Sequence, residues 1–242
     1  MKKIRIVFVI TTLVIFSASV SAQVKKAPLK RIPASKTKLV LKQPVLKKIP
    51  GVRVKLTTDS GVIVIRLYDK TPKHRDNFIK LANDHFFDSL LFHRVINGFM
   101  IQGGDPQSKN APPAAMLGNG DVGYTIPAEF DTALFHRKGA LAAARTNNPE
   151  KASSGCQFYL VQGKTYTDAE LDNMEKGMGI KFSPLKRKIY KTLGGTPFLD
   201  MNYTVFGEVE SGLAVIDKIA TVPKDANDRP LGDVHMKIEV MK

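Results

Sequence analysis

The stretch FHRVINGFMIQGGDP, from Phe92 to Pro106, has the residues best suited to chemistry, because it sets the charged Arg94 and the amide of Gln102 among apolar residues. One interpretation is structural: two buried strands meet at an Asn97-Gly98 turn and end in a Gly103-Gly104 bend. That interpretation explains the apolar residues but not Arg94 and Gln102. A guanidinium is costly to bury unpaired, so Arg94 should either be paired or line a cleft. On residue types alone, both interpretations stay open.

The other residue types that carry chemistry indicate neither a metal nor a cofactor. Cys156 is the only cysteine, which excludes an intrachain disulfide, a paired-thiol redox site and a Cys-ligated zinc site. The five histidines never have the i, i+4 spacing of a zinc protease helix. We therefore expect no cofactor and no metal, and we expect Cys156 to be a buried structural residue rather than a nucleophile.

The elements that must position Arg94 are short strands separated by turn signals. Val52–Thr57 and Val62–Tyr68 alternate in polarity around Asp59-Ser60-Gly61, which predicts a β-hairpin. A helix is predicted to begin at Thr71-Pro72, with Phe78, Ile79 and Leu81 on its buried face. Short apolar segments then recur between Gly, Pro and Asp clusters: Leu91–Ile96, Phe99–Gln102, Gly139–Ala143, Gln157–Val161, Thr204–Val209 and Val234–Val240. Many short strands with few helices favour a mainly β fold, a closed antiparallel barrel.

Two further helical regions are predicted. A second helix on the barrel is predicted at about Gly212 to Ala220, where apolar residues can share one face. Between two predicted strands, Thr167-x-x-Glu170 is a capping box. Ser183-Pro184 and Gly194-Gly195 then give the start and stop signals of another helix. Residues 164–196 are therefore predicted to be a helical insertion.

The N-terminal part has a different composition. Residues 1–22 have the layout of a secretory signal peptide, with basic residues, an apolar run from Ile6 to Phe16 and small residues before a cut after Ala22. Because the apolar run is shorter than the ~20 residues that span a bilayer, cleavage is favoured over a membrane anchor. Residues 23–50 are predicted to be a basic linker rich in Pro and Lys, and residues 51–242 the folded domain. We expect an exported protein, in a periplasm or elsewhere in the cell envelope or outside the cell.

The net charge of +15 comes almost entirely from the first 58 residues. The first 58 residues have fourteen of the 37 Lys and Arg residues and no acidic residue, which leaves 23 basic against 22 acidic residues from 59 to 242. A solvated linker is the preferred interpretation, with weak contact to anionic envelope surfaces and no specific nucleic acid as partner. A rival hypothesis makes the leader the working part, a polyanion binder with the barrel as its scaffold.

Three blocks, taken in order, resemble cyclophilins. Phe92–Pro106 is similar to the family's pattern FHR-V-I-x-G-F-M-x-Q-G-G-D. LAAARTNNPEKASSGCQFYL (Leu141–Leu160) resembles its L-x-M-A segment, Gly-rich loop and S-Q-F-F. FLDMNYTVFGEVESGLAVIDKI (Phe198–Ile219) resembles its W-L-D-G-x-x-x-V-F-G strand pair and following helix. The resemblance runs from about Val52 to Met241 and leaves out the leader and the insertion.

This resemblance implies a closed eight-stranded antiparallel β-barrel capped by two α-helices, and peptidyl-prolyl cis/trans isomerase activity on proline-containing polypeptides such as folding client proteins. It implies a catalytic Arg94 beside a pocket for the proline ring formed by Phe99, Met100, Tyr159 and Leu199. Gln102 would orient Arg94. The resemblance further implies substrate contacts before the proline at Ala144, Arg145 and Gln157, and a groove edge at His93, Phe198 and Tyr203. A monomer is expected, and the insertion should flank the groove.

The chain departs from the family pattern at some of these positions. Phe198 stands where many members have Trp, which should weaken binding of the cyclic peptide drugs that target cyclophilins. Tyr159 replaces a pocket Phe, so its hydroxyl must find water or a polar partner. The resemblance also leaves open an alternative function: a chaperone-like module of the same fold that binds proline-containing segments without isomerising them.

Overall fold

The computed structural model describes residues 50–242. It begins with a β-hairpin formed by alternating apolar residues. Strands β1 (Gly51–Thr58) and β2 (Gly61–Tyr68) pair antiparallel along their whole length. Successive side chains of a strand point to opposite faces, so every second residue enters the interior. The inward residues have no exposed surface: Val54, Leu56, Ile63, Ile65 and Leu67. The predicted hairpin is confirmed.

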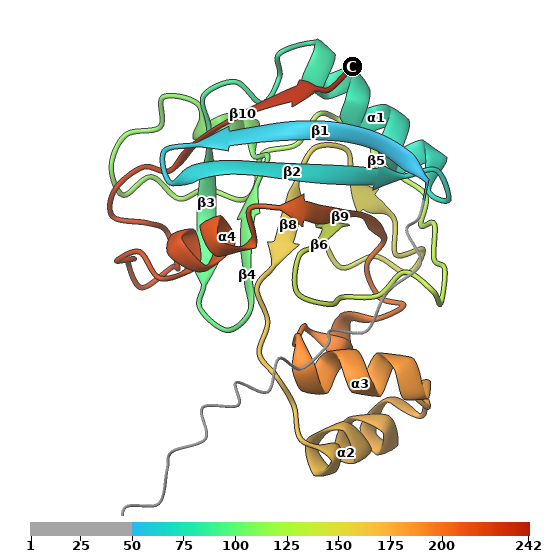
Figure 1. Cartoon of the computed structure of the whole chain (residues 1–242). Helices are drawn as coiled ribbons and strands as arrows, with labels where there is room; N and C mark the ends of the chain where they lie inside the picture. Colours follow the sequence, from blue (N-terminus) through green and yellow to red (C-terminus); the bar gives the residue numbers. More distant parts are fainter. Residues whose placement is uncertain (1–49) are drawn as a thin grey trace, which may run out of the picture. The chain divides into compact units, whose positions relative to one another are not determined.

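Eight strands close into an antiparallel barrel in the order β1-β10-β3-β4-β8-β6-β9-β2 (Figure 1). Closure leaves no free strand edge, which satisfies the backbone hydrogen bonds of short strands. The predicted barrel is confirmed, and its other strands match the predicted segments to within one or two residues: β3 (Leu90–Ile96), β4 (Met100–Gly103), β6 (Ala140–Ala143), β8 (Phe158–Val161), β9 (Val205–Ser211) and β10 (His235–Val240). Two very short strands, β5 (Thr125–Ile126) and β7 (Ser153–Ser154), pair outside the barrel.

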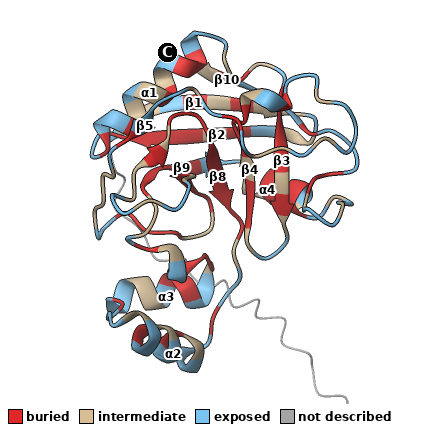
Figure 2. Cartoon of the chain, turned by 180° about the vertical axis from the view of Figure 1, so that it is seen from behind, coloured by how far each residue is buried: buried red, intermediate tan, exposed pale blue. Residues whose placement is uncertain are grey.

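Two helices pack on the barrel as predicted. Helix α1 (Pro72–Asn83) has Pro at its first turn and buries Phe78 and Leu81, while the predicted Ile79 is only partly buried at its edge. Helix α4 (Leu213–Ala220) buries Ile216 and Ile219 in the same core cluster. The barrel interior and these two helix faces form the main hydrophobic core, visible as the buried strands in Figure 2.

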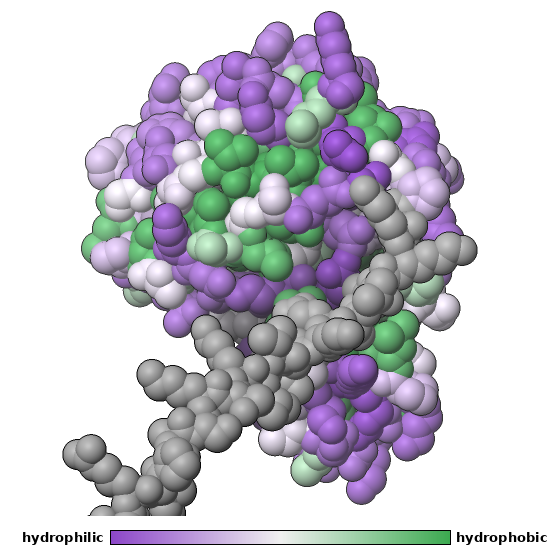
Figure 3. All heavy atoms as spheres, viewed as in Figure 1, coloured by the Kyte–Doolittle hydropathy of each residue, from purple (hydrophilic) through white to green (hydrophobic). Residues whose placement is uncertain are grey.

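The insertion between β8 and β9 is a pair of helices beside the barrel (Figures 1 and 2). Helix α2 (Asp168–Met178) begins at the predicted Thr167/Glu170 capping box and ends at Gly179, whose φ of 65° suits glycine. Helix α3 (Pro184–Thr192) begins after Ser183, whose side chain accepts a hydrogen bond from the Lys186 backbone N–H. In Figure 3 the visible face of this pair is mostly hydrophilic. Four of its apolar or aromatic residues are buried in one cluster: Leu171, Phe182, Ile189 and Tyr190.

Short 3-10 turns complete the described chain, η1 (Pro106–Ser108) and η2 (Pro197–Leu199), the second leading from the insertion back to the barrel. The predicted signal peptide and nearly all of the predicted linker lie outside the described residues. Within residues 50–242, no helix has the length and apolar character needed to cross a membrane.

Candidate active site

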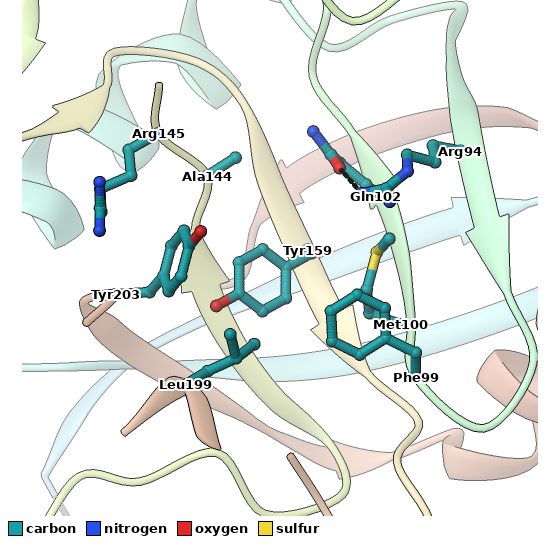
Figure 4. A pocket seen from close by; sticks show the side chains of 9 residues that line it. All are labelled: Arg94, Phe99, Met100, Gln102, Ala144, Arg145, Tyr159, Leu199 and Tyr203. Carbon is teal, nitrogen blue, oxygen red and sulfur yellow. Dashed lines mark hydrogen bonds between the residues drawn. The ribbon is translucent and has the colours of Figure 1, made fainter. Parts of the chain in front are cut away.

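A cavity of about 190 Å³ opens on the outer wall of the barrel beside β4 and β8. Its floor and walls come from four separate parts of the chain: the β3–β4 hairpin, the end of β6, β8, and the segment from η2 to β9. Figure 4 shows the nine residues that line it, all of them predicted site residues: Arg94, Phe99, Met100, Gln102, Ala144, Arg145, Tyr159, Leu199 and Tyr203. Residues more than one hundred positions apart are thus brought together by barrel closure.

Arg94 stands at one end of the cavity with a largely free guanidinium. It lies opposite Gln102 in the β3–β4 register, and its Nη1 is 3.4 Å from Oε1 of Gln102. Its Nε lies 3.7 Å from a carboxylate oxygen of Asp228, and 43% of the side chain is exposed. Both contacts are long, so most of the five N–H donors remain available to a bound molecule.

A row of amide side chains fixes the position of Gln102. Its Nε2 donates to Oε1 of Gln157 at 3.0 Å, and Gln157 in turn donates to the carbonyl oxygens of Gly118 and Gly120 at 3.0 and 2.7 Å. Gln157 is 7% exposed and does not line the cavity. The structure therefore places it behind Gln102, where it orients the amide that faces Arg94.

The middle of the cavity is apolar. Met100 and Tyr159 are buried in the floor, and Leu199 borders it from η2. Phe99 stacks on Phe198, with ring centroids 5.8 Å apart and planes at 29°. Phe198 is 42% exposed and lies behind Phe99 rather than on the cavity wall. An apolar notch thus adjoins a cationic hydrogen-bond donor.

At the far end, Arg145 is already engaged. Its Nε donates to the carbonyl of Asn202 at 2.9 Å, and its guanidinium lies 4.8 Å from the centre of the Tyr203 ring. Neighbouring Ala144 has its backbone N–H bonded to Gln157 and its carbonyl to Ser154. Arg145 therefore shapes the edge of the cavity through Tyr203, while Arg94 is the guanidinium that is free to act.

Comparison with known proteins identifies the family. The family model of the cyclophilin type peptidyl-prolyl cis-trans isomerase/CLD matches residues 53–240. A putative peptidyl-prolyl cis-trans isomerase of Staphylococcus haemolyticus is 35% identical over 184 residues, covering 76% of this chain and 87% of that protein. This chain belongs to the cyclophilin family. Like the family, it is a peptidyl-prolyl cis-trans isomerase, and its substrates are proline-containing peptides.

Solved structures give the same fold for this cyclophilin. The Cryptosporidium parvum cyclophilin aligns with a TM-score of 0.58 at 21% identity, covering 79% of this chain and 98% of that one. A second crystal structure of that protein, in the presence of the dipeptide Ala-Pro, aligns with a TM-score of 0.57 and the same identity.

A putative bifunctional phosphatase/peptidyl-prolyl cis-trans isomerase of Streptococcus pyogenes is 34% identical over 192 residues, but the matched part makes up only 38% of that protein's length.

Two polar residues of this cyclophilin escaped the sequence analysis. The Tyr159 hydroxyl is 2.9 Å from Nε2 of His136, and Nδ1 of His136 is 3.1 Å from Asp200. Asp200 follows Leu199 in the motif block and could have been suspected from it. His136 had no local signal, because it lies 23 residues from Tyr159 and 64 from Asp200.

Cys156 is buried, and burial raises the pKa of its thiol to about 11, which keeps it protonated and unreactive. This agrees with the structural role expected for it. Within residues 50–242, no group of three or more His, Cys, Asp or Glu side chains is arranged to hold a metal ion.

His93 was predicted at the groove edge, and it lines a second hollow that shares Arg94 and Gln102 with the cavity. It is 4% exposed, does not line the cavity, and its two ring nitrogens have no hydrogen-bond partner among residues 50–242. Burial lowers its pKa to about 4, helped by the charges of Arg94 and Arg229 and opposed by Asp105. The imidazole next to Arg94 is therefore neutral at physiological pH.

This buried histidine predicts an acid-sensitive fold. An unfolded histidine has a pKa near 6.5, so between pH 6.5 and 4 the unfolded chain binds a proton that folded His93 does not. Stability is complete above this window and is lost as the pH falls through it, by about 3 kcal/mol for this residue alone. The free energy of unfolding, measured with urea at pH 8, 6.5, 5.5 and 4.5, should show this loss. In His93→Leu it should fall less steeply with decreasing pH. At pH 8, where His93 is neutral in both states, the difference between variant and wild type reports packing alone. An equally steep pH dependence in the variant would contradict the assignment of the loss to His93.

Proposed function

We propose that this cyclophilin accelerates rotation about X-Pro bonds in exported proteins and so assists their folding, with Arg94 as the catalytic residue. The observation that carries the catalytic assignment is the half-exposed guanidinium of Arg94 at the end of an apolar notch. The secretory layout of residues 1–22 supports the choice of exported clients.

The reaction requires no bond to be made or broken. Conjugation between the nitrogen lone pair and the carbonyl opposes rotation with a barrier of ~18–20 kcal/mol, and X-Pro bonds interconvert over tens of seconds or longer. As the bond twists, conjugation is lost and the lone pair localises on the prolyl nitrogen. A donor held beside that nitrogen therefore stabilises the twisted state more than either planar state, and this differential binding lowers the barrier.

Arg94 meets these requirements. Its guanidinium stays protonated at any physiological pH and offers several N–H groups in a fixed fork. Gln102, held by Gln157, limits the directions in which that fork can point. A thousandfold acceleration needs about 4 kcal/mol of differential stabilisation, which a charged hydrogen bond in a partly dry site can largely supply.

The apolar notch holds the proline ring while the acyl side of the bond turns. Phe99, Met100, Tyr159 and Leu199 present carbon surface of the kind a pyrrolidine ring buries. The structure of the Cryptosporidium parvum cyclophilin in the presence of Ala-Pro supports this choice of ligand. Residues that precede the proline would run along the edge formed by Ala144 and Arg145, beyond which lies Tyr203.

Export and client choice are tested together. Expressed with its own leader, the protein should be recovered outside the cytoplasm as a shortened chain that begins at Gln23. That mature protein should shorten the proline-limited refolding phase of an exported client protein in proportion to enzyme concentration. Recovery of the full-length chain in the cytoplasm would overturn the export proposal while leaving the enzymatic activity intact.

A further inference from the structure

A chain of buried polar groups runs from the insertion to the floor of the cavity. In α3, Lys186 Nζ lies 3.0 Å from Oδ2 of Asp200, and the Tyr190 hydroxyl lies 2.9 Å from both carboxylate oxygens. Asp200 accepts from the backbone N–H of His136 at 2.9 Å and from its Nδ1 at 3.1 Å. The other ring nitrogen of His136 meets the Tyr159 hydroxyl at 2.9 Å.

The proton positions along this chain follow from its chemistry. Burial acts to raise the pKa of Asp200, but hydrogen bonds from His136 and the charge of Lys186 outweigh it and lower that pKa, so the carboxylate is ionised and only accepts. Burial and Lys186 keep the pKa of His136 low, so its ring is neutral and carries its hydrogen on Nδ1. Nε2 is therefore an acceptor, and the Tyr159 hydroxyl donates to it.

The chain is shielded from water, so each contact is strong. His136, Asp200 and Tyr190 are at most 3% exposed, and Tyr159 is 5% exposed. The Lys186 side chain, at 14%, is the most exposed of these groups. Losing one partner in such a place leaves the next polar group unsatisfied, which costs more than the bond itself contributes.

The insertion holds Lys186 and Tyr190 on a rigid support. Its helices share their own hydrophobic cluster, which includes Leu171, Phe182, Ile189 and Tyr190. Buried Glu175 of α2 ties the pair together by accepting from the Phe182 backbone N–H and from the Arg187 and Lys181 side chains. The position of α3 is thereby transmitted to the Asp200 carboxylate.

At its other end the chain reaches two walls of the cavity. The Tyr159 hydroxyl points away from Arg94 and towards Leu199 (Figure 4), and Leu199 directly precedes Asp200. The Tyr159 ring lies parallel to His136 and edge-on to Tyr203, so it has fixed neighbours on both sides. A displaced Asp200 would therefore move both Tyr159 and Leu199.

We propose that the insertion sets the shape of the proline pocket, with Lys186 and Tyr190 as positioning residues that act through Asp200 and His136 on Tyr159. This proposal rests on the assignment of the cavity to the proline ring. This series of polar groups ends on the pocket side. Tyr159 pairs with Gln102 in the β4–β8 register, but within residues 50–242 no side-chain hydrogen bond joins the series to Arg94 or Gln102. Removing a contact from this series of polar groups therefore weakens substrate binding and leaves kcat, the rate at which bound substrate is isomerised, nearly unchanged.

The test compares Lys186→Met and Tyr190→Phe with wild type in the full mature protein. Each variant should raise KM for a prolyl peptide by about three- to tenfold, with kcat within about twofold. Lys186→Arg, which keeps the charge, should restore most of the lost affinity. The Kd of an unreactive prolyl peptide, measured by calorimetry, should follow KM, and it remains a valid readout even if turnover is absent.

Two matched controls separate this role from general support of the fold. Lys188→Met alters an exposed lysine of the same helix, and Tyr166→Phe removes a buried insertion hydroxyl that bonds to Gly195 instead. Both should leave KM and kcat at wild-type values. Nitrogen-15 NMR of His136 gives a check that does not depend on activity. The charge of Lys186 lowers the pKa of His136, while Asp200 raises it, so removing that charge in Lys186→Met should raise the pKa.

A double-mutant cycle decides the matter. In a Tyr159→Phe background, Lys186→Met should add little further loss, because the contact through which it acts is already gone. The proposal is overturned if folded Lys186→Met binds like wild type, if the losses add fully, or if kcat falls as much as kcat/KM. If the wild-type protein binds no prolyl peptide, the assignment of the cavity to the proline ring is refuted instead. The His136 titration would still test the contacts from Lys186 through Asp200 to His136.

Discussion

Arg94→Ala is expected to lower kcat/KM by about two to three orders of magnitude, the loss seen when one preorganised donor to a transition state is removed. The loss should fall on kcat, because the guanidinium stabilises the twisted bond more than the planar substrate. The apolar notch stays intact, so the Kd of a prolyl peptide should change much less. A direct assay of cis/trans interconversion, run at several substrate concentrations, separates the two.

The same substitution should leave the melting temperature almost unchanged. The Arg94 side chain is 43% exposed, and its only polar contacts within residues 50–242, to Gln102 and Asp228, are 3.4 and 3.7 Å long. Contacts of this kind contribute about 0–1 kcal/mol. Arg53→Ala is a suitable control, because Arg53 is a half-exposed arginine of β1 that pairs with Glu210 and does not line the cavity. An Arg94→Ala protein that retains half of the wild-type kcat would remove Arg94 from the mechanism.

The fold was predictable from local patterns because its strands and helices are defined by neighbouring residues. Alternation within eight residues gives β1 and β2, and the Thr167/Glu170 capping box spans three residues. The pairing order of the strands has no such local signal and was not predicted. The number of barrel strands came from the resemblance to cyclophilins. The two-residue strands β5 and β7 were missed, since a pair that short has no detectable period.

The site shows the same division. Its nine lining residues were predicted because they lie in motif blocks, and the structure brings all of them to one cavity. The support behind them was not predicted: Gln157 orients Gln102, and His136 accepts from Tyr159. His93, predicted at the groove edge, borders a second hollow beside Arg94 but is only 4% exposed, a degree of burial that the motif did not indicate. Such contacts arise only when the barrel closes, so residue spacing along the chain cannot predict them.

Phe158→Ala is expected to cause the largest loss of stability without altering the site. Phe158 is 1% exposed in the centre of the core, where its ring meets those of Phe78, Phe87 and Phe92 nearly edge-on at 5.4 to 6.2 Å. Truncating such a ring leaves a cavity and costs about 3–5 kcal/mol. For a domain of this size the melting temperature should fall by roughly 10 °C. Phe158→Leu fills part of the space and should cost clearly less.

Activity of Phe158→Ala provides the sharper comparison, because its neighbours in sequence belong to the site. Residues of a strand alternate between faces, so Phe158 and Leu160 face the barrel core while Tyr159 faces the cavity. Measured well below its transition, at about 10 °C, the variant should keep kcat/KM within about threefold of wild type. A stable Phe158→Ala protein would show that the core around this ring collapses easily. A destabilised variant with a large loss of kcat at low temperature would show that β8 does not hold its two faces independently, and the separation of core from site would fail.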